Sequence, residues 1–132
     1  MKVQKIDLKN SADERGSLAV LEEDTLPFII KRIFSVTGHT GALRGEHSHK
    51  ECSQFIFCIS GNVEVLCDDG KQKKNFILLP NTHGILIPPG IWSQQTYLEE
   101  NTIINVICDR AYESEDYIHN YEEFLKSQGI SS

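Results

Sequence analysis

Two histidines separated by one residue, His47 and His49, are the side chains of this chain best suited to move protons. Imidazole titrates near neutral pH, which makes histidine a natural general acid or general base. If the segment around them is an extended strand, residues two apart point to the same face, so both rings would enter one cavity. A surface loop in which nearby carboxylates hold the rings is an equally good interpretation of the pair taken alone.

The residues around the pair favour a cavity. Gly41 precedes His47 by six positions, and Gln54 follows the second histidine by five. Further along the chain comes the segment Pro88–Ser93, with the sequence PPGIWS. The spacing and order resemble the two motifs of cupin barrels, with Gln54 and Ser93 standing where a glutamate ligand and a histidine ligand often occur.

The donor set predicts a site without a metal. A cupin metal centre needs about three histidines and a carboxylate around the ion. Only His47 and His49 remain here, because glutamine and serine are poor ligands and the other histidines stand at different positions. We therefore expect neither a metal nor another cofactor, and we interpret the two histidines as acid–base groups.

The elements that would position these residues are mostly strands. Short runs rich in Val, Ile, Leu or Phe, bounded by Gly, Pro, Asn or Asp, are typical of strands. The predicted strands are Val3–Leu8, Ser17–Glu22, Ile29–Val36, Ser53–Ser60, Asn62–Cys67, Lys74–Leu79, Gly84–Ile87 and Thr102–Cys108. The tail, Asp116–Gly129, has the apolar spacing of a helix. Many short strands and one terminal helix predict an all-β sandwich or barrel in a single domain, residues 1–132.

The composition excludes several classes of partner. Of the 132 residues, 39% are hydrophobic and 24% charged, as in an ordinary globular domain. The net charge of −6 argues against nucleic acid as a partner, and no apolar run is long enough to cross a bilayer. Four cysteines without a C-x-x-C pair predict buried thiols in a reducing compartment. We therefore expect a cytoplasmic protein that makes no contact with membranes.

Nearly the whole chain resembles the cupin dTDP-4-keto-6-deoxyglucose 3,4-ketoisomerases of deoxysugar biosynthesis. The resemblance rests on the segments Asp13–Leu18 (DERGSL), Arg44–Lys50 (RGEHSHK), Pro89–Trp92 (PGIW) and Tyr112–Ile118 (YESEDYI). It implies an all-β cupin jelly-roll barrel with a short C-terminal helix. It also implies a metal-independent isomerase that moves the carbonyl from C4 to C3 of a dTDP-linked hexose, in the biosynthesis of deoxyamino sugars for lipopolysaccharide O-antigen.

The same resemblance assigns roles to individual residues. His47 and His49 would be catalytic and transfer protons through an enediol. We give the carbon proton to His49 and the oxygen proton to His47, and the reverse assignment stays open. The predicted substrate-binding residues are Arg15, Arg32, Arg44, Gln54 and Trp92. Arginine suits phosphate oxygens because its planar fork donates two hydrogen bonds at once, whereas the ring of Trp92 could equally belong to the core.

The resemblance further implies a homodimer in which the N-terminal strand crosses to the partner, so that Arg15 would serve the neighbouring active site. The sequence departs from the family at Phe34 and Ser35, where two tyrosines are common, and at Ser93, where a histidine often stands. The nearest alternative is a dTDP-sugar 3,5-epimerase, although such enzymes usually have longer chains. A non-catalytic nucleotide-sugar-binding cupin is the alternative from another class, but it would need no pair of titrating histidines.

Overall fold

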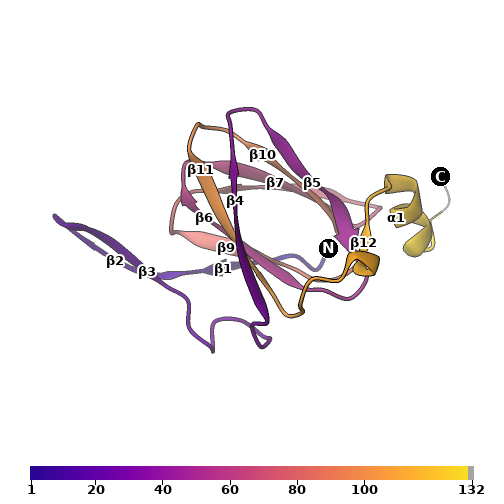
Figure 1. Ribbon diagram of the computed structural model, residues 1–132, viewed down its shortest axis with the longest axis horizontal. Coiled ribbons are helices and arrows are strands. Elements are labelled where there is room, and N and C mark those ends of the chain that lie inside the picture. Colours follow the sequence, from indigo (N-terminus) through magenta and orange to yellow (C-terminus); the bar gives the residue numbers. More distant parts are fainter. Residues whose placement is uncertain (131–132) are drawn as a thin grey trace.

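Two antiparallel five-stranded sheets face each other in the computed structural model, which describes residues 1–130 (Figure 1). The first sheet has the order β1 (Gln4–Asp7), β9 (His83–Ile87), β6 (Gln54–Ser60), β11 (Thr102–Cys108) and β4 (Arg32–Gly38). The second has the order β12 (Tyr117–Ile118), β5 (Leu43–His49), β10 (Trp92–Tyr97), β7 (Val63–Asp68) and β8 (Lys73–Leu78). The predicted all-β class is confirmed.

The space between the sheets is filled by side chains that alternate along the strands. In β6, Ile56 and Cys58 point into this central core, and Phe55 points to the opposite face. There Phe55 packs with Leu8 and Leu26 of the N-terminal segment, which covers the outer face of the first sheet. Strand β6 is hydrophobic on both faces because both faces are covered. All four cysteines are free and buried, as predicted.

The N-terminal part of the chain also forms a hairpin, made of β2 (Lys9–Asp13) and β3 (Gly16–Val20). The hairpin projects from one end of the molecule, and the C-terminal elements lie at the other end (Figure 1). Its strands pair only with each other within the described part of the chain. The side chain of Leu18 on the hairpin is 62% exposed.

Each predicted strand overlaps an observed one, but the list of predicted strands omitted β2, β5, β10 and β12. Strand β10 lacks an apolar alternation because the positions that point inward are polar. Ser93 and Gln95 are buried at 4% and 7% exposure, next to the fully buried Tyr97. Strand β2 was omitted because all of its residues are exposed.

The predicted helix over Asp116–Gly129 is too long at its N-terminal end. The helix α1 spans Tyr121–Ser127 and begins at Asn120, whose side chain accepts a hydrogen bond from the N–H of Glu123. A short 3₁₀ turn, Ser114–Asp116, and the strand β12 precede it. Residues 117–118 form a strand instead of a helix because the edge of β5 offers backbone hydrogen-bond partners, a long-range contact that the local pattern does not reveal. None of the helices within residues 1–130 has the length and apolar character required to span a bilayer.

Candidate active site

Strand β5 carries both histidines and contains a β-bulge just before them. Gly45 and Glu46 lie opposite the single residue Gln94 of β10, since His47 pairs with Ser93 and Arg44 pairs with Gln95. Gly45 adopts a φ of +93°, and a Cβ there would lie 3.2 Å from the Cα of Gln94, so glycine is required.

The bulge places Arg44 on the same face of the sheet as the histidines. Residues two apart on β10 share a face, and directly paired residues on neighbouring strands share a face. Ser93 and Gln95 therefore bring His47 and Arg44 to the inner face, together with His49. If the same residues paired regularly without a bulge, Arg44, three positions before His47, would point outward. Bulges are common beside active sites because they redirect a side chain in this way.

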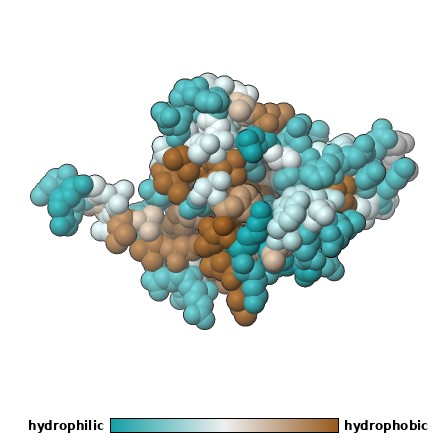
Figure 2. Space-filling view, in the orientation of Figure 1, coloured by the Kyte–Doolittle hydropathy of each residue, from teal (hydrophilic) through white to brown (hydrophobic). Residues whose placement is uncertain are grey.

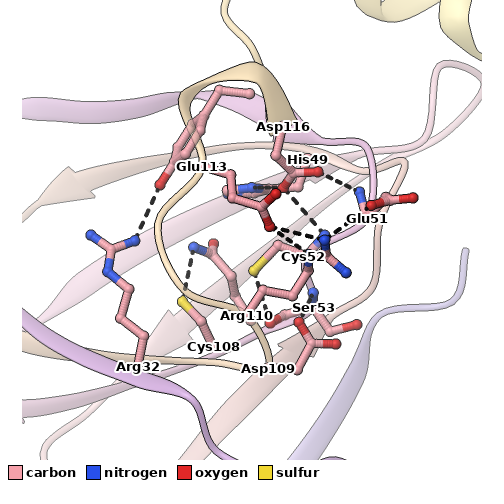
Figure 3. Close-up of polar contacts among 12 residues, drawn as sticks. Arg32, His49, Glu51, Cys52, Ser53, Cys108, Asp109, Arg110, Glu113 and Asp116 are labelled. Carbon is pink, nitrogen blue, oxygen red and sulfur yellow. Dashed lines mark hydrogen bonds and ion pairs between the residues drawn. The ribbon is translucent and has the colours of Figure 1, made fainter.

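His49 forms a buried pair with Asp116 (Figure 3). Its Nδ1 lies 2.9 Å from Oδ2 of Asp116, and both side chains are 8% exposed. The carboxylate also accepts hydrogen bonds from the backbone N–H groups of Glu51, at 2.7 Å, and Cys52, at 3.3 Å. Burial disfavours the charge of Asp116, but the hydrogen bonds from His49 and the backbone outweigh it and lower the pKa. A carboxylate can only accept, so Nδ1 of His49 carries the proton and Nε2 carries a lone pair.

His47 is held in the same tautomer by a different partner. Its Nδ1 lies 2.5 Å from the carbonyl oxygen of Gly45, which can only accept a hydrogen bond. Burial and, to a smaller extent, the neighbouring His49 lower the pKa of His47 to about 4, against the opposing effect of the hydrogen bond to Gly45. Burial also lowers the pKa of His49, against the opposing effect of Asp116. Both rings are therefore neutral near pH 7, and both Nε2 atoms can accept a proton.

The two Nε2 atoms differ in accessibility. Nε2 of His49 is buried and has no hydrogen-bond partner among the described residues. His47 is only half-buried, and its ring centroid lies 5.0 Å from that of His49. Of the two histidines, His47 is therefore the one that a ligand reaches first.

Strand β12 adds an aromatic wall to the site. Tyr117 pairs with His49 across the strands, and its ring centroid lies 4.3 Å from that of His49 and 5.0 Å from that of His47. His119 stacks on Tyr117 with an interplanar angle of 8°. From β4 in the other sheet, Nη1 of Arg32 donates a 3.4 Å hydrogen bond to the Tyr117 hydroxyl. The site thus lies where the edges β4 and β12 of the two sheets approach each other.

One group of side chains has the composition of a metal site. A ring nitrogen of His49, the thiol of Cys52 and an oxygen of Asp116 lie within 4.8 Å of one another. The carboxylate already accepts three hydrogen bonds, and an interaction with Cys108 together with burial raises the pKa of the Cys52 thiol. The geometry is that of a hydrogen-bonded acid–histidine pair, and the expected absence of a metal stays a prediction.

Comparison with known proteins assigns the family. The family model described as "FdtA: WxcM-like, C-terminal" matches residues 1–129. The chain belongs to this family. A curated member, the TDP-4-oxo-6-deoxy-alpha-D-glucose-3,4-oxoisomerase of Aneurinibacillus thermoaerophilus, is 32% identical over 123 residues, which cover 92% of this chain and 88% of that protein.

Solved structures agree with the family assignment. A 3,4-ketoisomerase from Helicobacter canadensis superposes with a TM-score of 0.92 at 30% identity, covering 98% of each chain. The 3,4-ketoisomerase QdtA from Thermoanaerobacterium thermosaccharolyticum, solved as a mutant with TDP-4-keto-6-deoxyglucose, gives 0.90 at 29% identity and covers 96% of this chain and 93% of its own. Sugar epimerases match at 15–17% identity, which shows a shared fold alone. The predicted cupin jelly roll and the resemblance to the ketoisomerases are confirmed.

Among the substrate-binding residues predicted for this WxcM-like chain, Arg44 lies on β5 with the two histidines, and Arg32 lies on β4 of the other sheet. Arg15 lies away from them on the projecting hairpin, 86% exposed and paired with Asp13 at 2.6 Å. Gln54 is buried and donates to the sulfur of Cys108 at 3.7 Å. The ring of Trp92 packs under α1, which is the core role that the sequence also allowed.

Asp116, Tyr117 and His119 are site residues that were not predicted from the sequence. All three lie in the tail that the apolar spacing assigned to a helix. A signal was present, because Tyr112–Ile118 is one of the segments that resemble the ketoisomerases. Their position beside the histidines depends on a two-residue pairing between β12 and β5, which is a long-range contact.

Proposed function

We propose that this protein is a TDP-4-keto-6-deoxyglucose 3,4-ketoisomerase that moves the carbonyl from C4 to C3 without a metal. One observation carries the proposal: His47 and His49 share a face, and their Nδ1 partners leave both Nε2 atoms free to accept protons. The family match over residues 1–129 supports the choice of reaction and substrate.

The chemistry begins with the hydrogen on C3, which the carbonyl at C4 makes acidic. A neutral imidazole removes this proton, and the resulting enediol becomes the 3-ketone when C4 is protonated. The exposures favour His47 for the carbon proton, because Nε2 of His49 is covered. This reverses the assignment expected from the sequence. In the reversed assignment His49, whose ring is oriented by Asp116, transfers the proton between the oxygens on C3 and C4.

Cationic side chains would bind the diphosphate of the nucleotide. Arg44 is exposed on the inner face of β5, beside Thr37 and Gly38 at the end of β4, and Arg32 lies at the start of β4, beside Tyr117. Guanidinium groups offer two parallel donors to phosphate oxygens. The buried amide of Gln54 and the ring of Trp92 are weaker candidates for substrate binding than the arginines. The amide already contacts Cys108, and the ring already packs against Tyr121.

The active protein would be a homodimer that exchanges its N-terminal segment. Hydrophobic surface lies over β4 and the base of the hairpin (Figure 2). Exposed apolar residues on the hairpin, before β4 and on β4 are Leu18, Ile29 and Ile33, with exposures of 62%, 75% and 59%. Large apolar patches of this kind mark interaction sites. A second copy would cover the patch, and the projecting hairpin would carry Arg15 to the partner's active site.

The proposed setting is the cytoplasmic supply of deoxyamino sugars for lipopolysaccharide O-antigen. Four free, buried thiols are consistent with a reducing compartment. Neither nucleic acid nor a membrane is part of the proposal.

Proton NMR of TDP-4-keto-6-deoxyglucose in D2O, with the chelator-treated protein, tests the function. We expect a 3-keto species, with deuterium at C4 wherever the proton on His47 has exchanged with solvent. The matched control, His47→Asn, should give no 3-keto species while still binding TDP. Deuterium at C5 with inverted configuration would identify an epimerase instead. An unchanged spectrum with retained TDP binding would contradict catalysis and identify a nucleotide-sugar-binding protein.

A further inference from the structure

Of the five histidines in the chain, His119 is the one whose ring forms no hydrogen bond within residues 1–130. The rings of His39 and His49 each contact a carboxylate. Those of His47 and His83 contact a backbone carbonyl oxygen and a threonine hydroxyl. His119 is also exposed, so both of its ring nitrogens can bind a group that arrives from solvent.

Although it lacks hydrogen bonds, the His119 ring is held beside the catalytic histidines. It stacks on the ring of Tyr117, with a centroid distance of 5.5 Å and an interplanar angle of 8°. Its centroid lies 5.9 Å from that of His47. A sugar whose reacting carbons lie against His47 therefore brings its neighbouring groups within reach of His119.

The charge of His119 acts on both catalytic rings. Burial is the largest cause of the lowered pKa of His47 and of His49, and a positive charge on His119 contributes to both. A cation at this position makes His47 a weaker base unless an anion lies next to it. An anionic ligand that neutralises His119 would therefore leave the basicity of His47 intact.

The groups around the two catalytic rings lack an anion that could pair with His119. The titratable and charged side chains of this part of the site are His47, His49 and Asp116, together with Tyr117, Arg32 and His119. The one carboxylate among them, Asp116, already accepts three hydrogen bonds. Arg32 reaches the hydroxyl end of Tyr117 at 3.4 Å, and His119 covers a face of the same ring. Two groups that can carry positive charge thus flank Tyr117, and neither pairs with a carboxylate within the described part of the chain.

We propose that His119 is a substrate-binding residue whose protonated ring donates a hydrogen bond to the diphosphate of the nucleotide sugar. The inference rests on the proposed ketoisomerase function, which supplies this ligand. Imidazolium and guanidinium groups both form short, charge-assisted hydrogen bonds with phosphate oxygens. Arg32 would bind the same diphosphate from the hydroxyl end of Tyr117, and the hexose would extend from it to Nε2 of His47.

Substrate binding through His119 depends on pH. Histidine side chains change charge between about pH 5 and pH 8, and a bound diphosphate favours the charged form. Binding at neutral pH should therefore take up a proton, and the affinity for a nucleotide sugar should fall as pH rises.

The binding of TDP-glucose, measured by titration calorimetry at pH 6 and pH 8.5, tests the contact without any need for turnover. The diphosphate of this probe has no group that titrates in that range, so a change of affinity comes from the protein. We expect the wild-type Kd to be about tenfold higher at pH 8.5, because a hydrogen bond to a charged group is worth roughly this factor or more. Calorimetry in buffers of different ionisation enthalpy should show proton uptake on binding at pH 7.

Two replacements of His119 separate its charge from its ring. His119→Phe keeps a ring that can stack on Tyr117 but has no nitrogen, so Kd at pH 6 should rise about tenfold and then change little with pH. His119→Arg carries a permanent charge, so it should bind TDP-glucose about as tightly at pH 8.5 as the wild type does at pH 6. The matched control is His83→Phe, because Ile87 of β9 lies in line with Arg32 across the first sheet and His83 is at the other end of that strand. It should keep the wild-type Kd at both pH values.

A wild-type Kd that is equal at both pH values, or a His119→Phe protein that binds like the wild type at pH 6, would overturn the inference. If His119→Phe does not fold, His119→Arg still decides. A Kd that rises tenfold at pH 8.5 in this variant would show that another group titrates, and would overturn the inference as well.

The proposed function fails by a different result. If TDP-glucose binds with the expected dependence on His119 but TDP-4-keto-6-deoxyglucose gives no 3-keto species, the ketoisomerase reaction is refuted. The contact between His119 and the diphosphate is then supported on its own, as part of a nucleotide-sugar-binding site.

Discussion

Replacing Asp116 by asparagine tests whether the buried acid–histidine pair sets the proton on His49. The amide has nearly the same shape but carries no charge, and half of its polar surface donates instead of accepting. Asp116 now receives three hydrogen bonds, from His49 and from the N–H groups of Glu51 and Cys52. The NH2 group of an asparagine would face at least one of these donors.

The size of the effect follows from those contacts. A hydrogen bond to a charged group contributes about 1.5–3 kcal/mol, which corresponds to roughly a 10- to 150-fold loss of kcat if all of it acts in the transition state. Leaving one buried N–H unpaired also costs about 1–3 kcal/mol of folding stability. For a domain of this size, each kcal/mol lowers Tm by roughly 2–8 °C.

The assay combines turnover with a direct view of the ring. Initial rates are measured by NMR well below Tm, and nitrogen-15 NMR of the imidazoles reports which nitrogen of His49 is protonated. We expect Nδ1–H in the wild type, and in Asp116→Asn a mixture of tautomers with a lower kcat and little change in KM. Glu113→Gln is the matched control, since it removes a charge from the same segment but contacts Arg110 instead of His49.

Two results would refute this reasoning. If Asp116→Asn keeps kcat within about twofold, the pair contributes far less than a charged hydrogen bond should. If kcat falls but the tautomer of His49 does not change, Asp116 acts through the backbone of Glu51 and Cys52 instead of through the ring. Equal losses in Glu113→Gln would point to the charge of the whole segment.

Two further predictions concern stability and assembly. Burial lowers the pKa of His47 to about 4 from 6.5. Between pH 6.5 and pH 4 the unfolded chain therefore binds a proton that the folded chain excludes. As pH falls through this window, at most about 3 kcal/mol of folding stability is lost. Urea unfolding at pH 7 and pH 4.5 should show a smaller loss for His47→Asn, and equal losses in both proteins would contradict the burial argument. Leu18→Asp should shift the protein from dimer to monomer in sedimentation at micromolar concentration, because it places a charge on a hairpin position that is 62% exposed. Lys9→Asp on the same hairpin should leave the dimer intact. A monomeric wild type would exclude the exchanged dimer.

The sequence predicted the strands whose inner positions are apolar, and it failed where those positions are polar. Ile56 and Cys58 identify β6 because a hydrophobic core selects alternating apolar residues. Ser93 and Gln95 are also buried but line the polar part of the interior, so β10 has no such alternation. A site that binds a polar sugar necessarily weakens the pattern that reveals its own walls.

In the site, too, local spacing predicted some residues, whereas others depend on long-range contacts. His47 and His49 could be recognised because they are neighbours in sequence and their spacing alone places them on one face. Asp116 is 67 residues from the histidine that it contacts, and no local pattern predicts such a pairing. Arg44 lies three positions before His47, so regular alternation would place it on the opposite face, and only the bulge at Gly45, which depends on the register with β10, brings it to the same face.

The bulge divides β5 into two segments whose side-chain directions are set separately. If β5 paired regularly with β10 at unchanged length, the residues before the bulge would turn over, and the guanidinium of Arg44 would move to the outer surface while both histidines kept their direction. Deletion of Gly45 or Glu46 would instead leave Arg44 two positions before His47, on the same face without any bulge. The direction of Arg44 therefore depends on the pairing of β5 with β10, whereas the shared face of the two histidines depends only on their own spacing.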